Sequence, residues 1–375
     1  MKIKIFTLTI LTCLFLVSCE SENIEESSIQ NNQGKSTYDK DTKIELNSDM
    51  PSHSLIRELD FDLNMVVEET PCPDTELGAA FGAEFDDIFN DPYAFGPFGL
   101  WAGLLLDVNF VHSMIDDGPQ IFGNNGQYTD YVGNEVRNLE AFWNMPNEIS
   151  VRGQHNETLN DKEAIVSSLT SVWFNPLPPG FPELVADLII ENNELSDVLP
   201  ESPLFSSDGF AWDLDGFLGL DFKVIVIGDG LVELVSSVGT EDKIGWTTIL
   251  SHEWAHHIQF KYDYIEYWEG QFDNIPEETR AIELEADFVA SYYMTHKRGA
   301  TYNIKRIEQY LENFFQIGDC GFTSDGHHGT PDQRMEASRL GDKLAQSGQK
   351  KGHILSAEEV HLAFVAALPG IVAVP

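Results

Sequence analysis

The pattern of hydrophobic and polar residues divides the chain into three parts. Residues 5–17 form a mainly apolar run, residues 20–69 are polar and acidic with few aromatics, and from about residue 70 apolar positions recur to the end. Of the two longer parts, only the second carries enough apolar side chains to bury a core. We therefore predict one domain over residues 70–375, preceded by two segments of different character.

Within this domain, the periodicity indicates both helices and strands. Apolar spacings of three and four predict helices, and short β-branched runs bounded by turn residues predict strands. The predicted helices cover residues 129–142, 161–172, 181–191, 241–260, 276–298 and 332–345, and the predicted strands 148–153, 223–227 and 231–238. The fold class we expect is α+β, mainly helical around the centre of residues 222–345, with a small sheet upstream.

The predicted helix near residue 250 carries the motif His-Glu-x-x-His, with its histidines at His252 and His256. Residues four apart lie one turn above each other on the same helix face, so both imidazoles can bind one zinc ion. Glu253 lies beside them, where a carboxylate could take a proton from a zinc-bound water. A chance match on a buried helix is the alternative, and it is uncommon for so specific a pattern.

The next predicted helix offers a third metal ligand. Glu283 and Asp287 share one helix face, whereas Glu285 points elsewhere. A catalytic zinc site needs three protein ligands and one open position, and we assign Glu283 as the third. Asp287 would then hold a ligand histidine through its other ring nitrogen. The alternative is a solvated acidic helix face, which is common in so acidic a chain.

These motifs resemble those of the gluzincin metallopeptidases, and more closely those of bacterial neutral zinc metallopeptidases. The resemblance rests on three blocks, which are Leu250–Gln259, Glu283–Asp287 and His328–Arg334. It implies a zincin-like fold with zinc as the cofactor. In zinc peptidases an edge strand beside the metal helix pairs with the extended substrate, so the segment over residues 223–238 is either that strand or an internal one.

The third block implies two further site residues. Glycines and Pro331 predict a turn before the last helix, and the resemblance suggests that His328 and Arg334 reach the cleft. A donor there would stabilise the oxyanion that forms during peptide hydrolysis. The alternatives are a loop hydrogen bond for His328 and a structural salt bridge for Arg334.

The N-terminus predicts export and a lipid anchor. Lys2 and Lys4 precede an apolar run that is too short for a comfortable transmembrane helix, which is typical of a signal peptide over residues 1–18. Leu16-Val17-Ser18-Cys19 resembles the lipobox of bacterial lipoproteins, which implies cleavage before Cys19 and lipidation of its thiol. An ordinary signal peptide or a retained anchor are the alternatives. Residues 19–69 would be an acidic flexible tether.

The net charge and the cysteines indicate which partners and which redox compartment to expect. The 62 acidic and 22 basic residues give a formal net charge of −40, which excludes nucleic acids and anionic membrane surfaces as partners. After processing, Cys72 and Cys320 remain in an oxidising compartment, where they either form a disulfide or stay as separate thiols.

The function that we predict is an exported, membrane-anchored zinc metallopeptidase of the outer membrane or cell surface. Its partners would be peptide or protein substrates, and its chemistry the hydrolysis of peptide bonds by a zinc-activated water. The assigned residues are His252, His256 and Glu283 for the metal, Glu253, His328 and Arg334 for catalysis, and Asp287 behind the metal ligands. A lipid-anchored binding or assembly protein on a retained peptidase scaffold is the alternative.

Overall fold

A computed structural model of the chain describes residues 75–96, 99–172, 178–213, 223–269, 271–272, 274–302, 304–316, 328–348 and 352–373. The predicted signal peptide, the tether, the lipidation site at Cys19 and the pair Cys72 and Cys320 lie outside the described residues.

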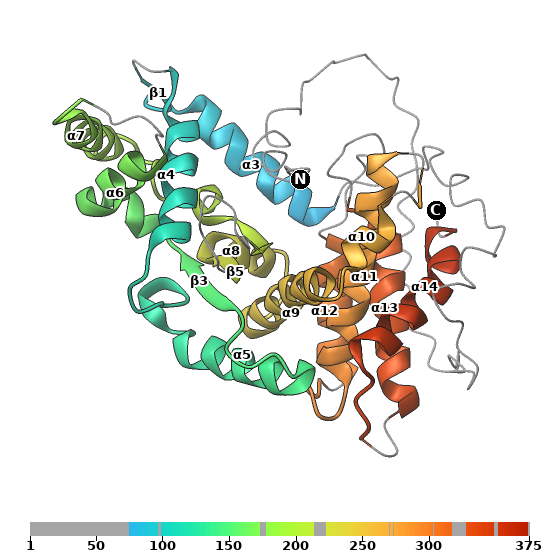
Figure 1. The fold of residues 1–375 in the computed structure, drawn as a ribbon. Helices are drawn as coiled ribbons and strands as arrows, with labels where there is room; N and C mark the ends of the chain where they lie inside the picture. Colours follow the sequence, from blue (N-terminus) through green and yellow to red (C-terminus); the bar gives the residue numbers. More distant parts are fainter. Residues whose placement is uncertain are drawn as a thin grey trace, which may run out of the picture.

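The described part of the chain is mainly helical with a small sheet, which confirms the α+β class (Figure 1). Its principal elements are, in order, α3 (Glu76–Asn90), β1 (Phe95–Gly96), β2 (Gly99–Leu100), α4 (Trp101–Ile115), α5 (Thr129–Trp143), β3 (Ser150–Gln154), α6 (Lys162–Val172), α7 (Phe181–Asn193), β4 (Gly209–Asp213), β5 (Lys223–Gly228), α8 (Asp229–Ser237), α9 (Asp242–Lys261), α10 (Tyr264–Trp268), α11 (Ile275–Thr295), α12 (Ile304–Gln316), α13 (Pro331–Gly348) and α14 (Ala357–Val372).

The larger sheet has β5 in its middle. Strand β3 pairs with β5 in parallel and β4 pairs with it antiparallel, so that β3 and β4 are the edges among the described strands. Val224, Ile225, Val226 and Ile227 are all fully buried, as expected for a strand covered on both faces. The segment beginning at residue 223 is therefore the internal strand rather than the edge strand.

The prediction of a second strand over residues 231–238 is wrong, because this segment is helix α8. Leu231, Val232, Leu234 and Val235 fit the spacing of a short amphipathic helix as well as that of a strand, and the valines favoured the strand. The chain turns at Gly228, and the buried residues of α8 then follow a helical face.

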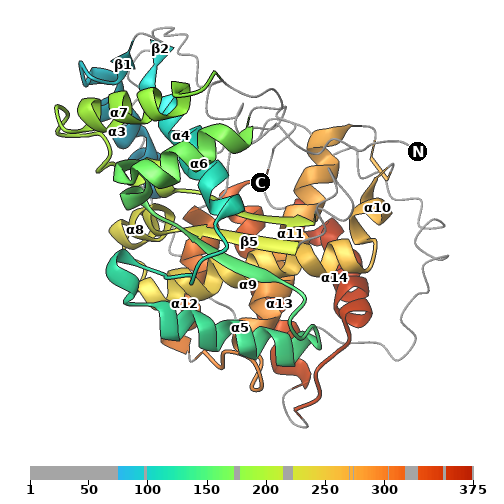
Figure 2. The same ribbon diagram turned by 60° about the vertical axis from the view of Figure 1, so that its left-hand side comes forward.

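Helix α9 packs against both β4 and β5, and against α11 on another side (Figures 1 and 2). Most of its residues are buried, which explains why no clear polar face marks this helix in the sequence. Trp246 and Trp254 are among its fully buried side chains. A helix held on several sides gives its side chains fixed positions, as a metal site requires.

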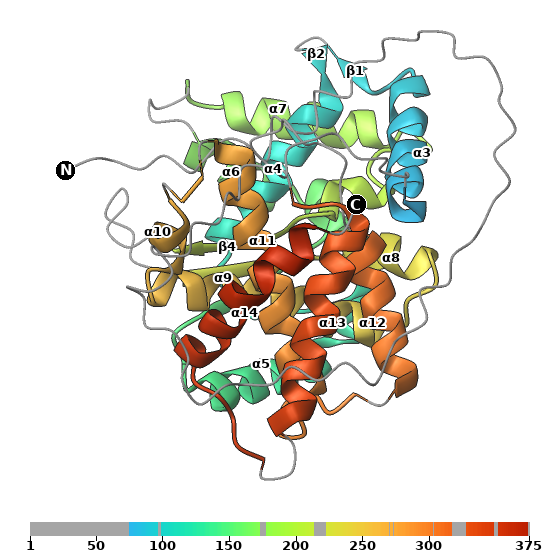
Figure 3. The ribbon, with the colours of Figure 1, turned by 90° about the vertical axis from the view of Figure 1, so that its right-hand side faces the viewer.

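Helices α11, α12, α13 and α14 form a layer beyond α9 (Figure 3). Helix α14 packs on the rest of the domain, since its Val360, Phe364 and Ile371 are fully buried in the larger apolar core. Ser356 begins α14 with a capping box to Glu359.

The described residues between 75 and 110 contribute mainly to a second apolar cluster. Leu105 of α4, Ile165 of α6, Ala186 of α7 and Val235 of α8 are all buried in it. Helix α8 therefore joins this cluster to α9, which follows it in the chain. Among the described helices, none has both the length and the apolarity that crossing a membrane would require.

Candidate metal and catalytic site

Helices α9 and α11 bring three potential metal ligands together. The Nε2 atoms of His252 and His256 lie 3.2 Å apart, and Glu283 places Oε2 at 3.1 Å from His252 Nε2 and Oε1 at 3.5 Å from His256 Nε2. Ligand bonds of about 2.0–2.1 Å in a tetrahedral zinc site put donor atoms about 3.3 Å apart. These three side chains therefore form a group that could hold a metal ion.

Local sequence signals fix the position of α11. The side chain of Asn274 caps the helix by accepting a hydrogen bond from the backbone N–H of Glu277, and Pro276 occupies its first turn. The helix ends at Thr295, which is three residues earlier than predicted. Two turns into the helix, Glu283 faces α9 and its carboxylate is nearly buried.

Asp287 lies one turn further along α11 and contacts the first histidine from behind. Its Oδ1 is 2.9 Å from Nδ1 of His252, and its side chain is fully buried. A carboxylate at Nδ1 keeps the proton on that nitrogen and turns the lone pair of Nε2 toward the metal position. The structure thus places Asp287 against Nδ1 of His252, which is the contact expected if His252 binds a metal through Nε2.

Arg334 reaches Asp287. It donates from both Nε and Nη2 to the two carboxylate oxygens at 2.7 Å, and it is 2% exposed. Its Nη2 lies 4.0 Å from Glu283 Oε2. This is the buried salt bridge that the sequence left as an alternative, so Arg334 is better described as holding Asp287 than as a donor to a substrate.

The His-Gly-Thr block positions Arg334 through its own turn. Thr330 and Gln333 form reciprocal hydrogen bonds between side chain and backbone at the start of α13, as in a capping box. Gly329 has a φ of +99° and packs against Leu284 of α11, where a side chain would be both strained and crowded. Sequence reasoning found the turn but not this cap, although the spacing Thr-x-x-Gln was visible.

His328 is exposed and lies within electrostatic reach of Glu283. His328 therefore lies on the segment that precedes α13, near enough to Glu283 for its charge to act on that carboxylate.

The acidic residues around the imidazoles of His252 and His256 favour a positive charge on this group. Burial by itself lowers the pKa of His252, but its contacts with Asp287 and Glu283 raise the pKa to about 10. Burial raises the pKa of Glu283, but the imidazoles of His256 and His328 hold it well below the usual range. A divalent cation would supply the same compensation, so the donor set fits a metal.

Glu253 differs from the other acidic residues of the site. It is 6% exposed, and among the described residues no hydrogen-bond partner engages its carboxylate. Burial raises its pKa, which brings it closer to the range where a general base is effective. Strand β4 runs past it, since a β-carbon built on Gly209 would lie 3.7 Å from Glu253 Oε1.

Sequence reasoning missed the partner of His256. Gln259, one turn further along α9, places Oε1 at 2.8 Å from His256 Nδ1. The spacing of three residues on one helix face was the available signal. His257, by contrast, faces away from the ligands and bonds through Nε2 to the carbonyl of Val224 at 3.0 Å. Burial lowers the pKa of His257 to about 4, so this link to the central strand involves a neutral imidazole.

The chain matches no protein-family model, no curated protein and no solved structure.

Proposed function

We propose that this protein is a zinc-dependent metallopeptidase. The observation that carries the proposal is the spacing of the Nε2 atoms of His252 and His256 and the carboxylate of Glu283, at 3.1–3.5 Å. Nδ1 of His256 bonds to the amide oxygen of Gln259 and Nδ1 of His252 lies 2.9 Å from the carboxylate of Asp287, which leaves both Nε2 atoms to bind a metal. Three protein ligands leave a fourth position open, as in catalytic rather than structural zinc sites.

In the proposed reaction, zinc would acidify a bound water to a pKa of about 7 and polarise the substrate carbonyl. Glu253 would accept the proton of the attacking water and return it to the leaving amine. Its buried carboxylate, beside the ligands and without a hydrogen-bond partner among the described residues, supports this role. His328 would donate to the carbonyl oxygen as its negative charge develops.

Strand β4 is the element best placed to bind the substrate backbone. It is an edge of the larger sheet among the described strands, it is antiparallel to β5, and its Gly209 lies beside Glu253. An extended peptide added to such an edge would be aligned by main-chain hydrogen bonds. The substrate strand is thus β4 in this proposal and not the segment over residues 223–238.

The family and the cellular setting belong to the same proposal. The blocks containing His252, Glu283 and Arg334 support a zincin-like fold related to the gluzincin metallopeptidases. Cys19 supports an exported protein anchored to the outer membrane or cell surface through a lipid. Labelling with a clickable fatty acid checks the anchor: the wild-type chain should be labelled, and a Cys19→Ser variant should not.

Metal content and cleavage of a peptide library test the function directly. The purified protein should contain about one zinc per chain, cleave peptides, lose activity with a chelator and regain it when zinc is restored. Zinc binding without cleavage of any peptide or protein would favour the binding or assembly protein on a retained scaffold. A protein that binds no zinc would contradict both the site and the function.

A further inference from the structure

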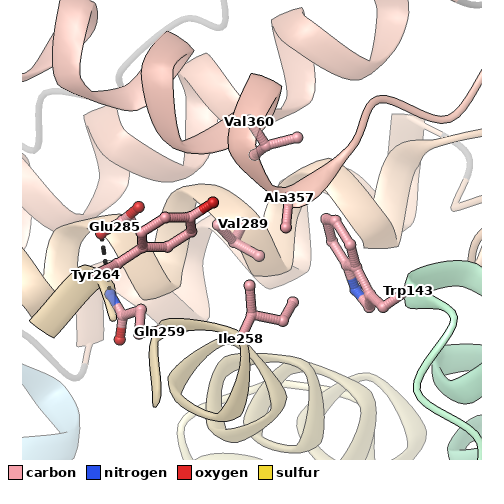
Figure 4. A pocket seen from close by; sticks show the side chains of 8 residues that line it. All are labelled: Trp143, Ile258, Gln259, Tyr264, Glu285, Val289, Ala357 and Val360. Carbon is pink, nitrogen blue, oxygen red and sulfur yellow. Dashed lines mark hydrogen bonds between the residues drawn. The ribbon is translucent and has the colours of Figure 1, made fainter. Parts of the chain in front are cut away.

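A second acidic residue of α11 is buried behind the metal site. Glu285 is 1% exposed, and its side chain points away from the metal position, as the sequence indicated. Its oxygens are nevertheless fully engaged: Oε2 accepts from Trp268 Nε1 at 2.8 Å and from Gln259 Nε2 at 3.2 Å, and Oε1 lies 2.5 Å from His361 Nδ1. Figure 4 shows Glu285 and Gln259 at the edge of a mostly apolar pocket, joined by their hydrogen bond.

The contacts of Gln259 determine how its amide is oriented. The amide nitrogen faces two acceptors, the carbonyl of Ile282 at 2.9 Å and the carboxylate of Glu285. Since a carbonyl and a carboxylate accept and do not donate, the NH2 group must lie on this side. The amide oxygen is then left to face Nδ1 of His256, where it accepts a hydrogen bond at 2.8 Å.

We propose that Glu285 is a positioning residue of the metal site, which acts on His256 through Gln259. By holding the amide of Gln259 in one orientation, Glu285 keeps the proton of His256 on Nδ1 and the lone pair of Nε2 toward the metal. If the amide turned over, its NH2 group would face Nδ1, and the proton of His256 would move to the nitrogen that must bind zinc. The inference rests on the zinc site of the proposed function.

The carboxylate of Glu285 also connects Gln259 and His256 to helices α10 and α14. His361 belongs to the C-terminal helix α14 and is fully buried, with its ring stacked on that of Tyr264 at 3.9 Å. Trp268 belongs to α10 and donates a hydrogen bond to Oε2 of Glu285. Docking of α10 and α14 therefore fixes Glu285, which in turn fixes Gln259. This explains why an acidic residue that points away from the metal is buried behind it.

Zinc affinity measured by competition with a chromophoric chelator, on the purified full chain, tests the proposal. Glu285→Gln keeps the shape but adds an NH2 group that allows the amide of Gln259 to turn over. We expect zinc affinity to fall about tenfold, at the low end of the usual 10–100-fold effect because Ile282 still favours the present orientation. Gln259→Met removes the acceptor at His256 and should lower affinity about 10–100-fold.

The double variant distinguishes an effect of Glu285 that passes through Gln259 from two independent effects of these residues on zinc affinity. If Glu285 acts through Gln259, then Glu285→Gln in the Gln259→Met background should cause no further loss of zinc affinity. Losses that multiply, or a folded Glu285→Gln variant that binds zinc as tightly as the wild type, would overturn the proposal. A wild-type protein that binds no zinc would instead overturn the proposed function, and this inference with it.

Ile371→Val is the control for a purely structural role. It removes one methyl group from a fully buried side chain of α14 that lies ten residues along the helix from His361, so it should lower the unfolding temperature without changing zinc affinity. If Ile371→Val weakens zinc binding as much as Glu285→Gln does, general loosening of the core explains both, and Glu285 has no positioning role.

Discussion

The carboxylate of Asp287 accepts two parallel hydrogen bonds from Arg334, from Nε and from Nη2, each 2.7 Å long. The pair joins α11 to α13 and is almost completely removed from solvent, with side-chain exposures of 0% and 3%. Asp287 also contacts His252, one of the three side chains that could hold a metal ion. The conformation of His252 therefore depends on Arg334, which lies 334 − 252 = 82 positions away in the chain.

We expect Arg334→Met to lower the free energy of unfolding by about 3–5 kcal/mol, because it leaves the carboxylate of Asp287 buried without its partner. Urea denaturation of the two proteins measures the difference. Lys162→Met is the control, since it breaks an ion pair with Asp187 that is about half exposed and should change stability by about 0–1 kcal/mol. Equal losses of unfolding free energy in the two variants would show that the buried ion pair of Arg334 stabilises the protein no more than an exposed one.

A close approach of α13 to α11 makes this pair possible. A β-carbon on Gly341 would lie 2.2 Å from the backbone oxygen of Phe288, the residue after Asp287. We therefore expect Gly341→Ala to destabilise the protein by about 1–3 kcal/mol through overpacking. Gly103→Ala in α4 meets no atom within 4 Å and should instead stabilise its helix by about 0.5–1 kcal/mol. Thermal unfolding of both variants checks the opposite signs.

Asp287→Asn tests whether the contact with His252 affects the proposed zinc binding. The amide is nearly the same size as the carboxylate but holds Nδ1 of His252 less firmly, so we expect zinc affinity to fall about 10–100-fold. Competitive zinc titration measures this fall. Asp187→Asn removes the same charge from the surface of α7 and should leave zinc affinity unchanged. If both variants weaken binding equally, overall charge and not the contact with His252 sets the affinity.

Short-range sequence signals predicted most of the helices on which the candidate site lies. The i, i+4 spacing of His252 and His256 and the Pro276 signal are properties of short segments, so helices α9 and α11 could be predicted. The segment over residues 231–238 fits two periodicities at once, and only its packing against the second core decides for a helix.

The surroundings of the ligands could not be predicted in the same way. The contact between Glu285 and His361 spans 76 residues and depends on where α14 docks. Periodicity indicated that Glu285 does not share the helix face of Glu283, and its contacts with Trp268 and His361 agree with this, but periodicity says nothing of what lies on that side. Likewise, Arg334 could be assigned to the region of the site, whereas its bidentate contact with Asp287 follows from the approach of two helices.

Stability should depend on pH through His155. Burial by itself lowers the pKa of this histidine, but the hydrogen bond and charge of Asp229, 2.7 Å from its Nδ1, outweigh burial and raise it. A raised folded pKa means that the stabilisation is fully present below the unfolded value of about 6.5 and is lost as pH rises through the folded pKa.

The difference in unfolding free energy between the wild type and His155→Gln should therefore shrink from about pH 6.5 upward, by no more than about 1.4 kcal/mol per pH unit. Urea denaturation between about pH 6 and pH 9 measures it. A difference that stays constant over this range would mean that His155 does not titrate differently in the folded protein.

In the proposed mechanism, Glu253 is needed for hydrolysis but not for zinc binding, whereas Glu283 is needed for zinc binding itself. Glu253→Gln keeps the shape of the side chain and touches no proposed ligand contact, so zinc content should stay near that of the wild type. Peptide hydrolysis should fall by about 10²–10⁴-fold or more, because an amide cannot accept the proton of the attacking water.

Glu283→Ala should lower zinc content itself, since it removes one of the three donors. Metal analysis after dialysis against a mild chelator, together with peptide cleavage, separates the two. Near-normal turnover by Glu253→Gln would require a different base, and full zinc occupancy in Glu283→Ala would require a different third ligand.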